Sequence, residues 1–189
     1  MTEKHELILK YRNDVIHGRK ITKSSASELF NLDNEFLLNL SDSANFITRH
    51  FQGSRVDIEE LANIKKNFCS EDCTFCSQSA FFNTQINDYQ LPSPEEIVQQ
   101  ALKAKNEGAN SFCLVAAWRE PNTLDFEKVC KIIEEINKKV GISIECSLGF
   151  LTVKQAKTLK ILQVKRYNHN LETSRSKFSE ICSTHTYQD

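Results

Sequence analysis

After residue 55 the chain alternates between short apolar segments and amphipathic ones, and this alternation constrains the fold more than any other feature. The segment 111–118 is almost wholly apolar, as expected of a strand that is buried on both faces. The stretch 124–139 carries apolar side chains at helical spacing, and Gly141 follows its end. By the same criteria we expect further strands over 56–64, 142–148 and 164–171, and further helices over 94–107, over 152–162 and from 178 onward.

Strands and helices that alternate with short connections predict an α/β fold with a parallel sheet and right-handed crossovers. A complete eight-stranded α/β barrel usually takes about 250 residues and at least ~200, so 189 residues are short for one. Ligands of parallel α/β folds bind at the carboxyl ends of the strands. We therefore expect functional residues after Ile64, around Ala117, around Cys146 and over 168–173.

The beginning of the chain has the pattern of helices without strands. An apolar stripe at helical spacing covers 7–15, and Gly18 is the expected stop. The run SASE at 25–28 fits a capping box that opens a second helix. We expect two regions, a helical segment over 1–52 and an α/β region over 53–189.

Charge and hydropathy exclude several classes of protein. The chain has 24 basic and 25 acidic residues and is 40% hydrophobic, which argues against a disordered chain and against a nucleic-acid binder that works through bulk positive charge. The longest apolar stretch, 112–118, is far shorter than the about 20 residues of a membrane-spanning helix. No secretory signal pattern begins the chain. We expect no membrane partner and a cytoplasmic location.

Three of the seven cysteines, Cys69, Cys73 and Cys76, lie in one short segment directly after the first expected strand. An odd number of cysteines cannot all pair internally, and in a reducing compartment metal ligation or catalysis is a common use for them. Three thiolates on one loop can hold three irons of a cubane iron–sulfur cluster, which leaves the fourth iron open to a small molecule. Zinc with one further ligand, and thiols without a metal role, are the alternatives at this point.

The spacing C-x₃-C-x₂-C, with an aromatic residue before the last cysteine, resembles the radical S-adenosylmethionine (SAM) superfamily. Further blocks are similar to the biotin synthase family within it, in the same order along the chain: NFCSEDCTFCSQSA (67–80), FCLVAAWREP (112–121), ECSLG (145–149), YNHNLET (167–173) and THTYQD (184–189). The resemblance implies a TIM-barrel-type radical SAM fold, here about the first four (βα) units preceded by amino-terminal helices. It also implies a sulfurtransferase that converts dethiobiotin to biotin.

Within this resemblance, Cys69, Cys73 and Cys76 would ligate a 4Fe-4S cluster whose open iron binds SAM. One electron through the cluster would cleave SAM to a 5′-deoxyadenosyl radical, which would take hydrogen from dethiobiotin. Phe75 would lie against the adenine of SAM.

The resemblance assigns roles after the later strands too. Asn168 and Asn170 would contact SAM and dethiobiotin, and Glu172 would bind the SAM ribose at a position where many members have Asp. Cys113 and Cys146 would bind an auxiliary 2Fe-2S or similar cluster, the source of the inserted sulfur. From the residues alone, without the resemblance, a small apolar core side chain is the favoured interpretation of each of these two cysteines.

Five other side chains are assigned no role in binding a metal or cofactor. Cys130 and Cys182 match no family ligand. His169 should point away from its Asn neighbours by strand alternation and pack in the interior. Trp118 is interpreted as an aromatic residue at the rim of the site, and Arg119 as a solvated charge.

The resemblance implies a reducing electron donor of the flavodoxin or ferredoxin type and admits a homodimer. Family members continue beyond the pattern that ends at 189, with further (βα) units and a third auxiliary-cluster cysteine, so this chain alone is expected to be incomplete for turnover. Two alternatives stay open. One is a non-catalytic or split-enzyme half barrel that binds an iron–sulfur cluster or SAM, and the other is a related radical SAM enzyme with another substrate, such as a hydrogenase maturase or a methylornithine synthase.

Overall fold

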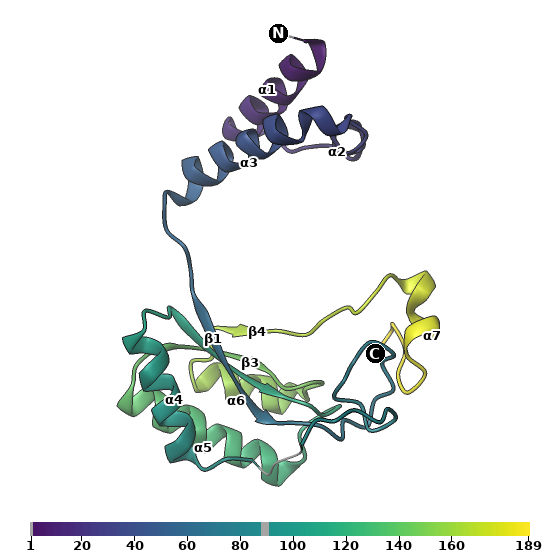
Figure 1. The fold of residues 1–189 in the computed structure, drawn as a ribbon. Helices are drawn as coiled ribbons and strands as arrows, with labels where there is room; N and C mark the ends of the chain where they lie inside the picture. The colour runs from purple at the N-terminus through teal and green to yellow at the C-terminus, as the bar shows by residue number, and fades with distance from the viewer. Residues whose placement is uncertain (1, 88–90) are drawn as a thin grey trace. The chain divides into compact units, whose positions relative to one another are not determined.

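The computed structural model describes residues 2–87 and 91–189, and the chain forms two compact units, Met1–Val56 and Asp57–Asp189 (Figure 1). The first unit is helical throughout, with α1 (Glu3–Ile16), α2 (Lys23–Phe30), a 3₁₀ turn η1 (Asn34–Phe36) and α3 (Leu37–Gln52). Helix α1 packs against α3.

The predicted start of the second helix is wrong by a few residues. Thr22 is the N-cap of α2, and its side chain accepts a hydrogen bond from the backbone N–H of Ser25. Ser25 therefore lies inside the first turn and does not open a capping box with Glu28. Instead, Glu28 accepts a hydrogen bond from the Tyr11 hydroxyl at 2.6 Å, which ties α2 to α1.

The second unit is a four-stranded parallel sheet of order β1-β2-β3-β4, as the alternation of strands and helices predicts. The strands are β1 (Glu59–Lys65), β2 (Ser111–Ala116), β3 (Ser143–Ser147) and β4 (Arg166–Tyr167). The connecting helices are α4 (Pro94–Asn106), α5 (Thr123–Lys139) and α6 (Val153–Ile161), and the chain ends with η2 (Arg175–Lys177) and α7 (Phe178–Ile181).

The two faces of this sheet differ. Helices α4, α5 and α6 lie on one side of the strands (Figure 1). The strand residues in the apolar core on that side are fully or almost fully buried: Ala62, Ile64, Phe112, Leu114, Ala116, Ile144 and Cys146. The alternate residues form what we call the open face: Glu59, Leu61, Asn63, Cys113, Val115, Glu145, Ser147 and Arg166. Leu61 on the open face is 53% exposed, although it lies within a strand.

Strand β4 is much shorter than the predicted 164–171. Among the described residues it pairs only with β3, and its last backbone hydrogen bond to that strand runs from the Asn168 N–H to the Cys146 carbonyl at 2.8 Å. Beyond this point the chain leaves the sheet, and Glu172 adopts a positive φ of 61°. The start of β1 also differs, at Glu59 instead of residue 56. Among the residues that the structure describes, no helix is both long and apolar enough to cross a membrane.

Candidate metal centre

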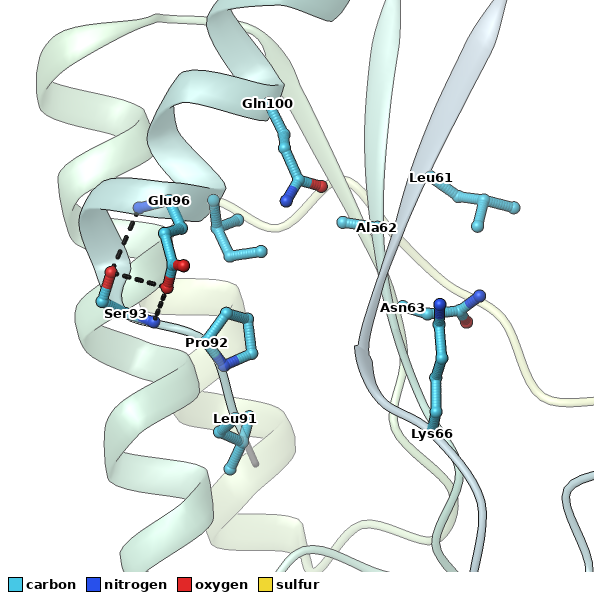
Figure 2. Close-up of a pocket in the computed structure, with 10 residues that line it drawn as sticks. Leu61, Ala62, Asn63, Lys66, Leu91, Pro92, Ser93, Glu96 and Gln100 are labelled. Atoms are coloured by element: carbon cyan, nitrogen blue, oxygen red, sulfur yellow. Dashed lines mark hydrogen bonds between the residues drawn. The ribbon is translucent and has the colours of Figure 1, made fainter. Parts of the chain in front are cut away.

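Two cavities lie beside β1. One, of about 670 Å³, lies between β1 and α4 and is lined by Leu61, Asn63, Ser93, Glu96 and Gln100 among others (Figure 2). Ser93 and Glu96 are already bonded to each other in the capping box of α4. The residues that line this cavity include no cysteine or histidine from the described part of the chain. The predicted cysteine ligands line the other cavity instead.

The second cavity, of about 250 Å³, lies where β1, β2 and β3 end. The three cysteines of the loop, Cys69, Cys73 and Cys76, all line it. Asn170 and Glu172, from the segment after β4, line the same cavity. The structure thus brings the three predicted cluster ligands together with two of the four residues predicted to bind SAM or substrate.

The cysteine loop is closed on itself by backbone hydrogen bonds. The N–H of Cys69 donates to the Gln78 carbonyl at 2.9 Å, and the N–H of Ala80 donates to the Cys69 carbonyl at 2.8 Å. The N–H of Cys76 donates to the Cys73 carbonyl at 2.9 Å, which makes a tight turn between the last two cysteines. These bonds hold both ends of the loop at the carboxyl end of β1.

The surroundings of Cys69 and Cys73 favour the protonated thiol. Burial raises the pKa of Cys69. Burial, and then the neighbouring Cys182 thiol, raise the pKa of Cys73 to about 12. Metal binding takes thiolates and releases their protons, so the bond to iron or zinc must offset the cost of deprotonating them. Three soft thiol donors around one cavity fit an iron–sulfur cluster with an open iron, and they also fit zinc.

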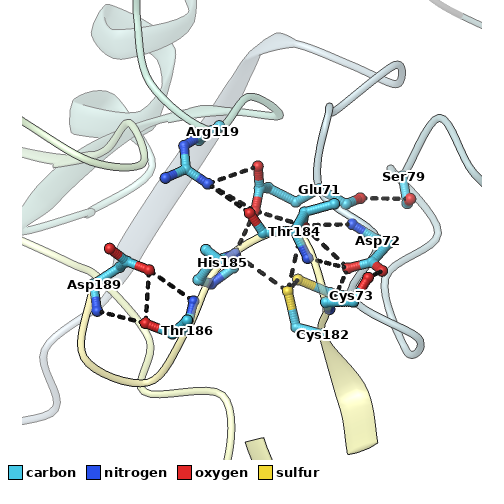
Figure 3. A network of polar contacts seen from close by, with 11 residues as sticks. Glu71, Asp72, Cys73, Ser79, Arg119, Cys182, Thr184, His185, Thr186 and Asp189 are labelled. Carbon is cyan, nitrogen blue, oxygen red and sulfur yellow. Dashed lines mark hydrogen bonds and ion pairs between the residues drawn. The ribbon is translucent and has the colours of Figure 1, made fainter. Parts of the chain in front are cut away.

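A buried carboxylate lies between the first two cysteines (Figure 3). Glu71 is 7% exposed and accepts hydrogen bonds from the Thr184 hydroxyl at 2.7 Å and from Arg119 Nη1 at 3.3 Å. His185 Nδ1 also contacts the Glu71 carboxylate. Burial alone would raise the pKa of Glu71, but the bonds from Thr184, His185 and Arg119 together hold it below its ordinary value. The carboxylate is therefore charged and compensated.

Asp72, the next residue of the loop, is hydrogen-bonded to residues 183 and 184. Asp72 accepts hydrogen bonds from the backbone N–H groups of Ser183 at 2.8 Å and Thr184 at 3.2 Å. The Ser183 hydroxyl and these N–H groups lower the pKa of Asp72. The N–H of Thr74 donates to the Ile181 carbonyl at 2.9 Å. Residues 181–185, which we call the closing segment, are thus bound to the cysteine loop.

The expectation that Arg119 is a solvated charge is wrong. Its guanidinium donates to Glu71 and to the Thr184 carbonyl, and it lies 5.1 Å from the centre of the Phe150 ring. Trp118 lines the cavity, and its indole N–H donates to the Leu148 carbonyl at 2.7 Å.

The expectation of an interior His169 is wrong as well. Because β4 ends at Tyr167, strand alternation does not extend to residue 169. His169 is exposed, with its ring 4.8 Å from that of Phe150 and its Nδ1 3.3 Å from the Gly149 carbonyl oxygen.

The other predicted residues lie outside the cavity. Phe75 is 61% exposed and is not among the lining residues. Asn168 turns toward β2, where its Nδ2 lies 3.9 Å from Cys113 Sγ. Cys113 and Cys146 are both buried, but they belong to opposite faces of the sheet. Cys182, interpreted as structural, is buried in the closing segment with its Sγ 3.9 Å from Cys73 Sγ.

Gly149 lies where the loop after β3 approaches the loop after β2, at the wall of the cavity. The N–H of Phe150 donates to the Arg119 carbonyl at 2.7 Å, and a Cβ on Gly149 would lie 2.1 Å from that same oxygen. Gly149 also has a positive φ of 71°. Only glycine allows this approach, and it places Arg119 within reach of Glu71.

The sequence interpretation missed Glu71, Arg119, Thr184 and His185 as parts of the site. The sequence did carry one signal, the acidic pair Glu71 and Asp72 between two of the cysteines. Carboxylates on a loop that lines a cavity need hydrogen-bond donors or positive charges nearby. Apart from Arg119, their partners lie more than 110 positions away in the closing segment, and no local pattern identifies such partners.

The comparisons with known proteins agree with this geometry. The radical SAM superfamily matches residues 63–189. A biotin synthase of Nitrosopumilus maritimus (strain SCM1) is 66% identical over 184 residues, covering 97% of this chain and 56% of its own length. A biotin synthase of Cenarchaeum symbiosum (strain A) is 59% identical over 182 residues, covering 96% and 56%. The chain thus spans about 56% of the length of these curated relatives.

Two solved structures share the fold. Methylornithine synthase superposes with a TM-score of 0.81 at 20% identity, covering 94% of this chain and 52% of that one. A maturase of the [FeFe]-hydrogenase superposes with a TM-score of 0.77 at 18% identity, covering 98% and 42%. At these identities the likeness establishes the architecture.

Proposed function

The chain belongs to the radical SAM superfamily, and from that membership we propose that it carries the cluster-binding and SAM-binding part of a biotin synthase, which inserts sulfur into dethiobiotin. The observation that carries the proposal is the convergence of Cys69, Cys73 and Cys76 on one cavity with Asn170 and Glu172. The identity of 66% to a biotin synthase over nearly the whole chain supports this substrate over those of the two distant structural neighbours.

We assign the 4Fe-4S cluster to the three loop thiols. When bound, such a cluster supplies the electron that cleaves SAM and thereby starts hydrogen abstraction from an unactivated carbon. The chain's own residues would bind and orient SAM and the substrate. Asn170 offers an amide donor and acceptor to SAM or dethiobiotin, and Glu172 offers carboxylate oxygens to the ribose hydroxyls of SAM. The exposed ring of Phe75 is a flat apolar surface for the adenine.

The auxiliary cluster, the sulfur source of the proposed reaction, is assigned to Cys113 and Cys146, as the family resemblance implies, and both thiols are buried. Asn168, predicted to contact SAM and dethiobiotin, lies with its Nδ2 3.9 Å from Cys113 Sγ. The reaction needs a reduced one-electron donor, for which we propose a flavodoxin or ferredoxin. A reducing cytoplasm suits the cluster thiols and the free state of the described cysteines. The homodimer stays a prediction.

The test is anaerobic reconstitution of the full-length protein with iron and sulfide, followed by incubation with SAM, dethiobiotin and a strong reductant. We expect 5′-deoxyadenosine and biotin to form, and both to be lost in Cys76→Ser but not in the matched variant Cys130→Ser on α5. If 5′-deoxyadenosine forms without biotin, the substrate assignment is wrong. If SAM binds but is not cleaved, the chain is a binding module and no enzyme.

A further inference from the structure

Cys182 lies beside one of the three loop cysteines without being part of the cavity. Its Sγ is 3.9 Å from Cys73 Sγ, and the residue is only 4% exposed (Figure 3). Among the described residues that line the cavity, Cys73 and His185 are present and Cys182 is not. The Cys182 thiol thus contacts the sulfur of a predicted cluster ligand from outside the space that the cluster would occupy.

Backbone hydrogen bonds on both sides of this contact hold the two sulfurs together. The Thr74 N–H donates to the Ile181 carbonyl at 2.9 Å. The Asp72 carboxylate accepts from the Ser183 N–H at 2.8 Å. These four residues are the immediate neighbours of the two cysteines in the chain, so the approach of the sulfurs does not depend on the side-chain contact alone.

The other polar groups around the Cys182 sulfur leave its proton available. His185 Nδ1 lies 3.2 Å from Cys182 Sγ and also contacts the Glu71 carboxylate. Because carboxylate oxygens accept hydrogen bonds, the Nδ1 proton belongs to that contact, and Nδ1 is not an acceptor for the thiol. The Thr184 hydroxyl lies 3.5 Å from the same sulfur. A charged acceptor forms a stronger hydrogen bond than a neutral hydroxyl, so a thiolate at Cys73 would be preferred over it.

Given the iron–sulfur function proposed above, on which this inference rests, we propose that the Cys182 thiol donates a hydrogen bond to Cys73 Sγ when the cluster is bound, as a positioning residue that raises the reduction potential of the cluster. Ligation removes the proton of Cys73, so that only Cys182 can then donate in this contact. Cys182 keeps its proton, because a second buried thiolate would place two negative charges side by side. Hydrogen bonds to the sulfurs help to set the potential of an iron–sulfur cluster. A donor stabilises the reduced cluster, which carries one more electron, more than it stabilises the oxidised cluster.

The experiment compares single variants of the full-length protein after anaerobic reconstitution with iron and sulfide. Cys182→Ala removes the donor, and Cys182→Ser keeps an O–H donor at nearly the same place. Cys130→Ala on α5 is the control for loss of a thiol elsewhere. Iron per chain measures the loading, and redox titration followed by electron paramagnetic resonance gives the potential of the 4Fe-4S cluster. Electron–nuclear double resonance before and after transfer to D₂O detects exchangeable protons beside the cluster.

We expect Cys182→Ala to retain the cluster at a lower reduction potential. Loss of one hydrogen bond should weaken the affinity of the cluster for the electron about fivefold, which is about 40 mV for a one-electron couple. This variant should also lose one exchangeable-proton signal that the unchanged protein, Cys182→Ser and the control all show. The potentials of Cys182→Ser and of the control should stay close to that of the unchanged protein.

The inference is overturned if Cys182→Ala keeps the unchanged potential, or if Cys182→Ser shifts it as far as Cys182→Ala does. It is overturned as well if Cys182→Ala fails to load the 4Fe-4S cluster while the control loads it, since Cys182 would then be a ligand or a purely structural residue. Each of these results leaves the proposed cluster function standing. Failure of the unchanged protein to load the 4Fe-4S cluster would contradict the proposed function itself.

Discussion

At the scale of single residues, Glu71 matters most among the groups that the motif did not reveal. Its carboxylate lies on the loop that carries the cluster ligands, and Arg119 and His185 compensate its charge. The reduction potential of an iron–sulfur cluster responds to nearby net charge and to hydrogen bonding. Glu71 and Arg119 are therefore positioning residues. Removing one should shift the reduction potential of the cluster in the opposite direction to removing the other.

We predict that Glu71→Gln raises the reduction potential of the 4Fe-4S cluster, because it removes a negative charge and leaves Arg119 uncompensated. Arg119→Gln should lower the potential for the converse reason. Both variants should lose iron to a chelator roughly tenfold faster, the usual effect of removing a supporting contact. Redox titration followed by electron paramagnetic resonance measures the first effect.

The control for both is Glu135→Gln, which removes the partner of Lys139 in an ion pair of 2.5 Å on α5. It should change neither the potential nor the rate of iron loss. Shifts of the same sign in the Glu71 and Arg119 variants would show that general loosening of the loop, and not charge, is responsible.

Gly149 allows a stability prediction. Gly149→Ala should destabilise the chain by two effects, since its φ of 71° disfavours a side chain and the new Cβ would lie 2.1 Å from the Arg119 carbonyl oxygen. The backbone effect alone is on the order of 1–3 kcal/mol. Gly141→Ala, with a φ of 65° and its nearest neighbour at 4.0 Å, carries only the backbone effect. Thermal melts should show a clearly larger loss for Gly149→Ala, and equal losses would contradict the close approach.

At the scale of elements, the ends of the helices between the strands were predictable, whereas the capping signal at 25–28 placed the start of α2 a few residues too late. The start of α4 at residue 94 is confirmed, where Ser93 and Glu96 form a capping box, and α5 and α6 lie where their apolar spacing predicts. The pairing of β4 was not predictable, because its length depends on how far β3 remains beside it. The wrong orientation of His169 followed directly from that overestimate.

The α4 cap gives a prediction of pH dependence. Hydrogen bonds from Ser93 hold the pKa of Glu96 below its ordinary value. A lowered folded-state pKa means that the stabilisation is present above the ordinary glutamate pKa and is lost as the pH falls through the lowered value. Ser93→Ala should cost about 1 kcal/mol at neutral pH. Denaturant melts from pH 7 to pH 3 should show less acid destabilisation in Glu96→Gln than in the unchanged chain. An identical pH profile would contradict the assigned role.

At the scale of the whole molecule, the sequence predicted the parallel α/β unit and the convergence of the cysteine loop with the segment after β4. Both follow from the rule that the carboxyl ends of parallel strands share one edge. The closing segment could not be placed in this way, because Asp72 binds Ser183 across 111 positions without any repeat or periodic signal. The sequence alone does not show that Cys113 and Cys146 lie on opposite faces of the sheet, because this depends on the register between β2 and β3.

The central claim is that Cys69, Cys73 and Cys76 hold a 4Fe-4S cluster with an iron that is open to SAM. Electron paramagnetic resonance of the reduced, reconstituted full-length protein, with and without SAM, tests it most directly. We predict a signal of the reduced 4Fe-4S cluster that changes when SAM is added, persists in Cys130→Ser and is absent in Cys76→Ser. Bound zinc without iron, or a cluster signal that SAM leaves unchanged, would contradict the account.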